Sequence, residues 1–378
     1  MKYRKKLYFY KFKQRTTMDG FKNVEIKNFR GIEHLKIDDF SRVNVFLGQN
    51  NSGKSSVLEA LLLLAGMSNP ELPLSLNKAR TRIFRIASLQ ETRYQFYNLD
   101  LNNTPEFSSL QVDGISRHLK MRLFHTETAD DRVQSIDEPL ILTETVRMPN
   151  TIEMLYAITT NNGTKHFRSS LFVNQSDVAS RQEPSKEYVE KNFAVLFSSD
   201  LLSSNLTNDL SELFKRKQKN ILLEQLQKFD ARINAIEILN NDVYVGFDDV
   251  KEMLPVSMSG DGLRRFLNIV AGSANPSNTM ILIDEIDNGL HYSAYKKLWE
   301  AIFALATDTN KQVFVTTHSK ETLYRLNEML EEHSEYQDAL RLYTIENTKL
   351  KGHQAYKYTF EGLAEACNND IEIRSVVL

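Results

Sequence analysis

Apolar and polar residues alternate near the amino end of the chain. The segments 21-FKNVEIKNF-29 and 32-IEHLKID-38, separated by an Arg-Gly turn, both predict strands. The next run, 42-RVNVFLG-48, is apolar, rich in β-branched residues and ends on glycine, which predicts a buried strand. A helix rich in Leu and Ala is expected from Ser55 to about Met67.

Two similar apolar runs occur far along the chain. The run 280-MILIDEID-287 ends in acidic residues, and 312-QVFVTTHS-319 ends in threonines and a histidine. Buried parallel strands would bring both endings to the same edge of a sheet, where ligands gather in α/β proteins. Between them, 257-SMSGDGLRRFLNIVAG-272 predicts a flexible turn followed by a helix from Leu263 to Ala271.

The middle of the chain has a different pattern. Short strands are predicted at 118–125, 140–148, 152–160 and 164–173, with a turn at 161–163, and 175–188 is a polar connection. A helical pattern runs from about Thr207 to Ile238, followed by a hairpin turn at Asn240-Asn241-Asp242. We therefore expect an α/β fold: a mixed β-sheet flanked by helices, with an inserted β-rich and helical middle region.

These patterns divide the chain into four parts. We expect an extension at 1–17, half of a nucleotide-binding head at 18–105, an inserted lobe at 106–248, and the second half of the head at 249–378. The extension holds seven Lys and Arg residues and no acid. Two interpretations stay open: a disordered or upstream-read extension with Met18 as the natural start, or an arm that binds a phosphate backbone.

Composition narrows the class of protein. An apolar content of 41% with 25% charged residues is ordinary for a globular protein. The single cysteine, Cys367, excludes an internal disulfide and a cysteine-built metal site. Without a secretory signal or a membrane-spanning run, we expect a cytoplasmic protein. Apart from its extension the chain is acidic, which does not suggest a general nucleic-acid binder.

The clearest motif is 48-GQNNSGKS-55, which matches G-x-x-x-x-G-K-[ST] between a predicted strand and a predicted helix. The two glycines let successive N–H groups converge on phosphate oxygens. Lys54 would neutralise the β- and γ-phosphates, and the Ser55 hydroxyl would bind Mg²⁺. The predicted ATP-binding residues are Gly48, Asn50, Asn51, Ser52, Gly53, Lys54, Ser55 and Ser56.

The two later strands supply candidate catalytic groups. Asp284 would orient Mg²⁺, and Glu285 would polarise the attacking water. His318 can contact the γ-phosphate and sense its loss. Structural roles are the alternative for each of these residues. The turn Ser259-Gly260-Asp261-Gly262 precedes a helix, so it is either another anion site or an ordinary helix cap.

Together these segments resemble an ABC-type ATPase head. The motifs are KNFRGI, GQNNSGKSS, SMSGDGLRRF, ILIDEIDNGLH and VFVTTHS, in that order. The similarity is to the RecF/SMC-like group and to the ATPase domain of OLD (overcoming lysogenization defect) proteins, labelled AAA_21 or AAA_15. It covers roughly 21–100 and 250–325, and SGDG replaces the SGGQ of membrane transporters.

The resemblance implies a shared site. It predicts a head-to-tail dimer, or a higher oligomer, in which Ser259, Gly260 and Gly262 bind the γ-phosphate of ATP held by the other protomer. It assigns 287–291 to the loop at the dimer seam and His318 to the γ-phosphate switch. It also implies a glutamine that reaches the metal, and the candidates are Gln90 and Gln95.

Absences in the sequence affect the expected role. There is no long heptad run for coiled-coil arms, and too few residues follow His318 for the Toprim nuclease domain of OLD proteins. By resemblance, such ATPases work with a separately encoded nuclease or effector in bacterial phage defence. The alternatives are a DNA-clamping repair or chromosome-maintenance head, for which DNA would be a partner, and a slow ATP-binding sensor.

Overall fold

The computed structural model describes residues 20–81, 89–126, 149–173, 179–182, 187–190, 193–197, 206–275 and 278–375. The predicted strand at 140–148 and the basic extension at 1–17 lie outside these ranges. Within them, no helix is long and apolar enough to cross a membrane.

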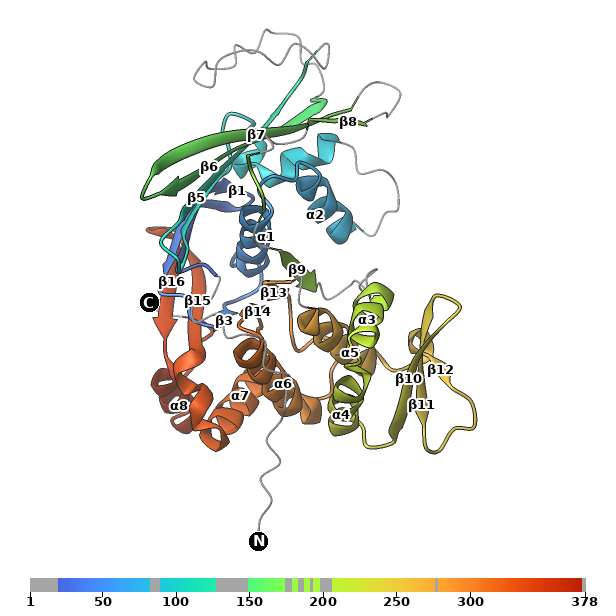
Figure 1. Cartoon of the computed structure of the whole chain (residues 1–378). Helices are drawn as coiled ribbons and strands as arrows, with labels where there is room; N and C mark the ends of the chain where they lie inside the picture. Colours follow the sequence, from blue (N-terminus) through green and yellow to red (C-terminus); the bar gives the residue numbers. More distant parts are fainter. Residues whose placement is uncertain are drawn as a thin grey trace.

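A six-stranded sheet forms the centre of the molecule (Figure 1). Its strand order is β16-β15-β3-β14-β13-β9, and every neighbouring pair is parallel except β15 and β16. The bounds are β3 (Val43–Leu47), β9 (Ala194–Phe197), β13 (Met280–Ile283), β14 (Gln312–Thr316), β15 (Leu340–Thr348) and β16 (Gly352–Tyr358). All residues of β3, β13 and β14 are buried, which explains why these strands are mainly apolar, with Asn44, Gln312 and Thr316 as polar members.

A second, antiparallel sheet lies above the first in Figure 1, in the order β2-β1-β4-β5-β6-β7-β8. Because β1 pairs with β4, the strands from 106 onward complete a sheet that the amino-terminal half begins. The predicted boundary at 105/106 therefore falls within one sheet. The bounds are β1 (Asn23–Phe29), β2 (Ile32–Asp38), β4 (Glu106–Leu110), β5 (Ser116–Phe124), β6 (Thr151–Thr160), β7 (Gly163–Val173) and β8 (Ala179–Gln182).

Helix α1 (Lys54–Ala65) follows the phosphate-binding loop at 48–55, hereafter the P-loop, and lies between the two sheets (Figure 1). Its apolar residues are buried all round, because one side faces β1, β4 and β5 and the other faces the central sheet. Helix α2 (Leu72–Thr81) and the short helices η1 (Leu89–Gln95) and η2 (Tyr97–Leu99) follow. The position of α1 makes it the link between the two sheets.

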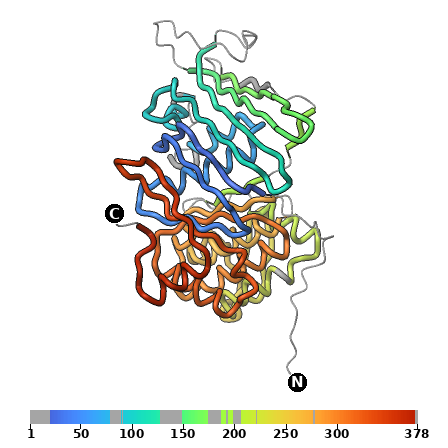
Figure 2. The backbone as a smooth tube through the Cα atoms, turned by 90° about the vertical axis from the view of Figure 1, so that its left-hand side faces the viewer, coloured from blue at the N-terminus to red at the C-terminus, as the bar shows by residue number. Residues whose placement is uncertain are grey.

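The remaining helices cover the opposite face of the central sheet (Figures 1 and 2). Along β14, Val313 and Val315 face these helices, whereas Phe314 faces α1. This alternation separates two hydrophobic cores. The bounds are α3 (Leu206–Lys215), α4 (Lys219–Phe229), α5 (Asp261–Ala274), α6 (Tyr295–Asp308), α7 (Lys320–Glu332) and α8 (Phe360–Asn368), with η3 (Val256–Met258), η4 (Tyr292–Ala294) and η5 (Ser334–Ala339).

The helical pattern predicted up to Ile238 is wrong at its end. Residues Ile233–Leu239 form β10, which pairs with β11 (Asp242–Phe247) and then β12 (Leu254–Pro255). An irregularity between Ile233 and Ala235 shifts the strand register, so Ile233 and Ile236 are both buried at a helix-like spacing of three. The predicted hairpin turn is confirmed: Asn240 and Asn241 have φ angles of 50° and 64°.

A buried arginine joins the antiparallel sheet to the end of α1. The Arg117 side chain, 3% exposed, pairs with Glu190 at 2.7 Å. Its guanidinium also donates to the carbonyl oxygens of Leu64 and Ala65, which are at the C-terminal end of α1. A cation is stabilised at this end of a helix.

We predict that Arg117→Met lowers the free energy of unfolding by about 3 kcal/mol, because it leaves Glu190 and two carbonyl groups without their buried partner. Urea denaturation measures this change. The control is Lys165→Met, which breaks an exposed pair with Glu187 and should have little effect. Equal losses for both variants would show that the Arg117 contacts contribute nothing particular to stability.

Candidate functional site

The P-loop connects β3 to α1 through a backbone that only certain residues can adopt. Gly48 and Gly53 have φ angles of 146° and 101°, and Asn51 has 63°. A Cβ atom at Gly48 would lie 2.5 Å from the carbonyl oxygen of Ile345, so the position excludes a side chain. The hydroxyl of Ser52 is buried, and the described residues offer it no hydrogen-bond partner. Asn50 is exposed, and Ser56 lies half-buried in the first turn of α1.

Lys54 lies across this loop. Its ammonium donates to the carbonyl oxygens of Gly48 and Gln49, each at 2.8 Å. Burial lowers the pKa of Lys54, while the carboxylates of Asp284 and two other acidic residues oppose that shift. The Lys54 ammonium therefore interacts electrostatically with the acidic residues that follow β13.

The end of β13 meets the start of α1 through Asp284. The Ser55 hydroxyl donates to Asp284 Oδ1 at 3.0 Å, and the Thr316 hydroxyl donates to the same oxygen at 2.6 Å. Residues 229 and 32 positions away along the chain therefore converge on one carboxylate. This contact places the predicted P-loop and the predicted acidic pair in a single site.

Glu285 adopts an unusual backbone conformation, with a φ angle of 49°. Its N–H donates to the Thr316 hydroxyl at 2.8 Å. Its carbonyl oxygen, and that of Asp284, accept from the Arg265 guanidinium at 2.6 Å. A non-glycine residue stays in this region only when its surroundings fix it, and such residues concentrate at functional sites. The sequence interpretation did not include Thr316 or Arg265.

The loop after β14 contacts the loop after β13. The Thr317 hydroxyl donates to Asp287 Oδ1 at 2.5 Å. His318 follows and is exposed, and Ser319 caps α7 by accepting from the Thr322 N–H. The predicted switch histidine is therefore next to the 287–291 loop, and its ring is open to a ligand.

The SGDG turn lies in a separate cleft of about 760 Å³. The cleft is lined by Ser259, Gly260 and Gly262, by Gly289 and His291, and by residues of the loop before β10, the end of β11 and the loop after it, but not by the P-loop. Gly260 caps α5 without a side-chain hydrogen bond, and the Ser259 hydroxyl has no partner in the described part of the chain. Within one chain, the turn and the P-loop are thus two separate sites.

The structure contradicts Gln95 as the metal-reaching glutamine. Its side chain is fully buried, and its amide donates to the Pro73 carbonyl and to the Asn77 side chain, both in α2. The strand next to β13 is β9, and the Asp284 N–H donates to the Phe197 carbonyl at its end. The end of β9 at Phe197, rather than Gln95, therefore lies beside Asp284. Residues 198–205 and the side chain of Gln90 lie outside the described residues.

Arg30, in the turn between β1 and β2, forms a buried ion pair with Glu59 of α1. Its guanidinium also lies over the Phe29 ring. The pair holds this turn against the helix that follows the phosphate-binding loop.

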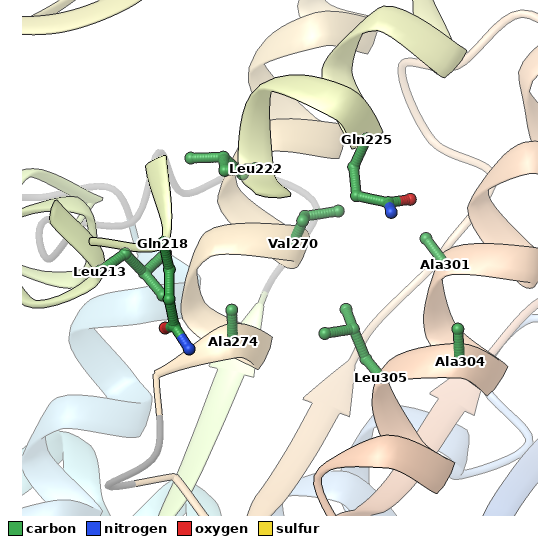
Figure 3. A pocket seen from close by; sticks show the side chains of 9 residues that line it. All are labelled: Leu213, Gln218, Leu222, Gln225, Val270, Ala274, Ala301, Ala304 and Leu305. Atoms are coloured by element: carbon green, nitrogen blue, oxygen red, sulfur yellow. The ribbon is translucent and has the colours of Figure 1, made fainter. Parts of the chain in front are cut away.

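Another cavity is visible between α3, α4, α5 and α6 (Figure 3). It is lined mainly by aliphatic side chains, with Gln218 and Gln225 contributing amides. Its volume of about 30 Å³ is enough for one or two water molecules. It is too small for a nucleotide or a cofactor.

Comparisons with known proteins agree with these motifs. The family model described as "AAA domain, putative AbiEii toxin, Type IV TA system" matches residues 43–323. A protein of Helicobacter pylori named "ATP/GTP phosphatase" is 27% identical over 333 residues, which are 82% of this chain and 88% of that protein. The DNA replication and repair protein RecF of Lactococcus lactis is 52% identical, but over only 44 residues, or 12% of each chain.

Among solved structures, an SMC head bound to the C-terminal winged-helix domain of ScpA aligns with 90% of this chain and 99% of its own, at 12% identity and a TM-score of 0.48. The SMC head of Thermotoga maritima aligns with a TM-score of 0.40 at 10% identity, over 90% of this chain and 98% of its own.

The family match extends from β3 to α7 and so includes the P-loop, the SGDG turn, the acidic pair and His318. The chain belongs to this AAA-domain family, and its fold is a P-loop ATPase head of mixed α/β type. The family resemblance predicted from the motifs is thereby confirmed.

We predict that Thr316→Val lowers kcat for ATP about tenfold or more, because valine keeps the shape but removes the hydrogen bonds to Asp284 and from Glu285. KM should change little. Thr316→Ser retains the hydroxyl and is the control. Steady-state kinetics on both variants decide the point, and similar kcat values for Val and Ser would show that the hydroxyl has no catalytic importance.

Proposed function

We propose that this protein is a Mg²⁺-dependent ATPase that dimerises head to tail around ATP and uses hydrolysis to control a partner protein. The observation that carries the proposal is the hydrogen-bonded cluster of Ser55, Asp284, Thr316 and Glu285. It joins a phosphate-binding loop to a candidate base, which is the combination that ATP hydrolysis requires.

The cluster fits a magnesium ion. A hydroxyl and a carboxylate oxygen lie 3.0 Å apart at Ser55 and Asp284, and Mg²⁺ prefers oxygen ligands with few protein groups and several waters. Ser55 would bind the ion directly, and Asp284 would orient its water shell. When bound, the metal neutralises phosphate charge. Gln95 is not among its ligands.

The other residues of the cluster would position and activate water. Glu285 is the base; its N–H donates to the Thr316 hydroxyl and its carbonyl oxygen accepts from Arg265, so its backbone is held in one conformation. Lys54 would exchange its two carbonyl partners for phosphate oxygens, which accept stronger, charge-assisted hydrogen bonds. His318 would contact the γ-phosphate.

A second protomer would complete each site. Ser259, Gly260 and Gly262 line a cleft at the amino end of α5, and the Ser259 hydroxyl has no hydrogen-bond partner among the residues that the structure describes. A terminal phosphate would supply an acceptor for these donors. The cleft that contains the SGDG turn does not include the P-loop of the same chain. We therefore propose that the turn binds ATP held by another copy.

Hydrolysis would therefore change the association of two heads and the shape that they present. The proposed receiver is a separately encoded effector, with a nuclease of a phage-defence system as the first candidate. The toxin–antitoxin description of the family supports a defence role. Because the relative from Helicobacter pylori is named a phosphatase of both ATP and GTP, both nucleotides belong in the assays.

We predict that Glu285→Gln binds ATP but accumulates as a dimer, because the site closes without a base to hydrolyse the nucleotide. Sedimentation velocity with saturating ATP and Mg²⁺ measures this. Lys54→Ala, which loses the phosphate cation, should fail to bind ATP and remain monomeric under the same conditions. A monomer for Glu285→Gln with ATP bound would contradict the dimer, and unchanged turnover would contradict Glu285 as the base.

DNA clamping is the second candidate function, favoured by the local similarity to RecF. Exposed lysines on the outer face of the antiparallel sheet could contact phosphates. However, Lys27, Lys36 and Lys120 each pair with a neighbouring carboxylate. Because these lysines are paired, this face offers little positive potential to attract the phosphate backbone of DNA.

We therefore predict that linear double-stranded DNA changes ATPase turnover less than about twofold at physiological salt. Turnover measured across a salt series, with and without DNA, tests this. A large stimulation that falls steeply with salt would reject this prediction and favour the DNA clamp over control of a protein effector.

A further inference from the structure

The segment after α8 returns to the nucleotide site. The Ile371 N–H donates to the Ala366 carbonyl at the end of α8, and Asp370 pairs with Lys320 of α7. Ile373 is buried in the core, and its carbonyl accepts from the Thr344 hydroxyl of β15. Contacts to α7, α8 and β15 thus fix the path of this segment.

The path brings it to the phosphate-binding edge of the central sheet. Thr344 pairs with Leu47, the last residue of β3 before the P-loop. The next residue of β15, Ile345, has the carbonyl oxygen that a side chain at Gly48 would strike. A residue that follows Ile373 is therefore close to the loops that would surround a γ-phosphate.

Arg374 is that residue, and it contacts the switch loop. Its Nη1 donates to the carbonyl oxygen of His318 at 2.7 Å. Its Nε and Nη2 donate to the two carboxylate oxygens of Glu372. The carboxylate therefore holds one edge of the planar guanidinium, which leaves the other edge for the His318 carbonyl. The Arg374 side chain is 31% exposed.

The neighbours of His318 on either side are fixed in other ways. Thr317 donates to Asp287, and the Thr317 hydroxyl also accepts the Ser319 N–H at 3.1 Å. The Ser319 N–H and the His318 carbonyl belong to one peptide unit, so the Thr317 hydroxyl holds one side of that peptide and Arg374 holds the other. Among the hydrogen bonds of the described residues, the Arg374 bond is the one that engages the His318 carbonyl.

We propose that Arg374 is a positioning residue for hydrolysis, which acts by fixing the His318 peptide so that the imidazole is directed at the γ-phosphate. This inference rests on the proposed role of His318. It makes the segment 369–375 part of the nucleotide site, although this segment lies outside the family match and carries no motif. A change in the position of the segment would alter turnover without contact with ATP.

The test is a double-mutant cycle of ATPase kinetics with Arg374→Ala, His318→Ala and the double variant. Arg374→Ala should lower kcat about tenfold with KM for ATP nearly unchanged, because ground-state binding depends on the P-loop. In the His318→Ala background the same change should have no further effect. Arg374→Lys keeps a donor for the carbonyl and should recover part of the activity.

Arg341→Ala is the matched control. Arg341 also pairs with a carboxylate, that of Asp39, and donates to backbone carbonyls, but it lies at the opposite end of β15. Its side chain is 22% exposed, comparable with Arg374. Its loss should leave kcat unchanged, and thermal unfolding of all variants shows whether any loss of activity is a loss of folding.

Three outcomes overturn the proposal, and they differ in cause. If the two single effects multiply in the double variant, Arg374 acts independently of His318. If His318→Ala lowers kcat but Arg374→Ala does not, this inference is wrong and the proposed function stands. If His318→Ala leaves kcat unchanged while Lys54→Ala abolishes turnover, the role of His318 is wrong, and that of Arg374 with it.

Discussion

The Asp284 carboxylate is the contact on which the nucleotide site depends. One of its oxygens accepts hydroxyl donors from the start of α1 and the end of β14, so β3, β13 and β14 have to end at the same level. The parallel register of these strands provides that alignment. A shift of one residue in β13 would turn its side chains to the opposite face. The P-loop and the candidate base would then belong to different sites.

The same contact explains why hydroxyl side chains, those of Ser55 and Thr316, surround this carboxylate. The half-buried Asp284 carboxylate is stabilised by donors, and hydroxyl groups supply them without adding a charge that would compete with a metal ion. Arg265 adds a cation that donates to the backbone carbonyls of Asp284 and Glu285. Asp284 therefore keeps its charge available to a metal and its waters.

Local motifs could be predicted from the sequence, whereas contacts set by strand order could not. The P-loop needs only consecutive residues, from Gly48 to Ser55, and an apolar strand before it. The position beside Asp284 depends on β9 pairing with β13, which lies more than 80 residues later in the chain. The sequence therefore offered Gln95 as a candidate glutamine, although its side chain packs against α2. The predicted helical pattern was wrong at Ile233 and Ile236, because an irregularity in the strand gives its buried residues a helical spacing.

The separation of the two hydrophobic cores has a consequence for how the protein opens. Alternate residues of β3 and β14 face different layers, so neither layer depends on the side chains of the other for its packing. Amide hydrogen exchange in the antiparallel sheet and in the α5–α8 layer should then follow different opening free energies. The central strands belong to both layers, so their amides should exchange most slowly. The phosphate-binding edge would thus rest on the part of the molecule that opens last.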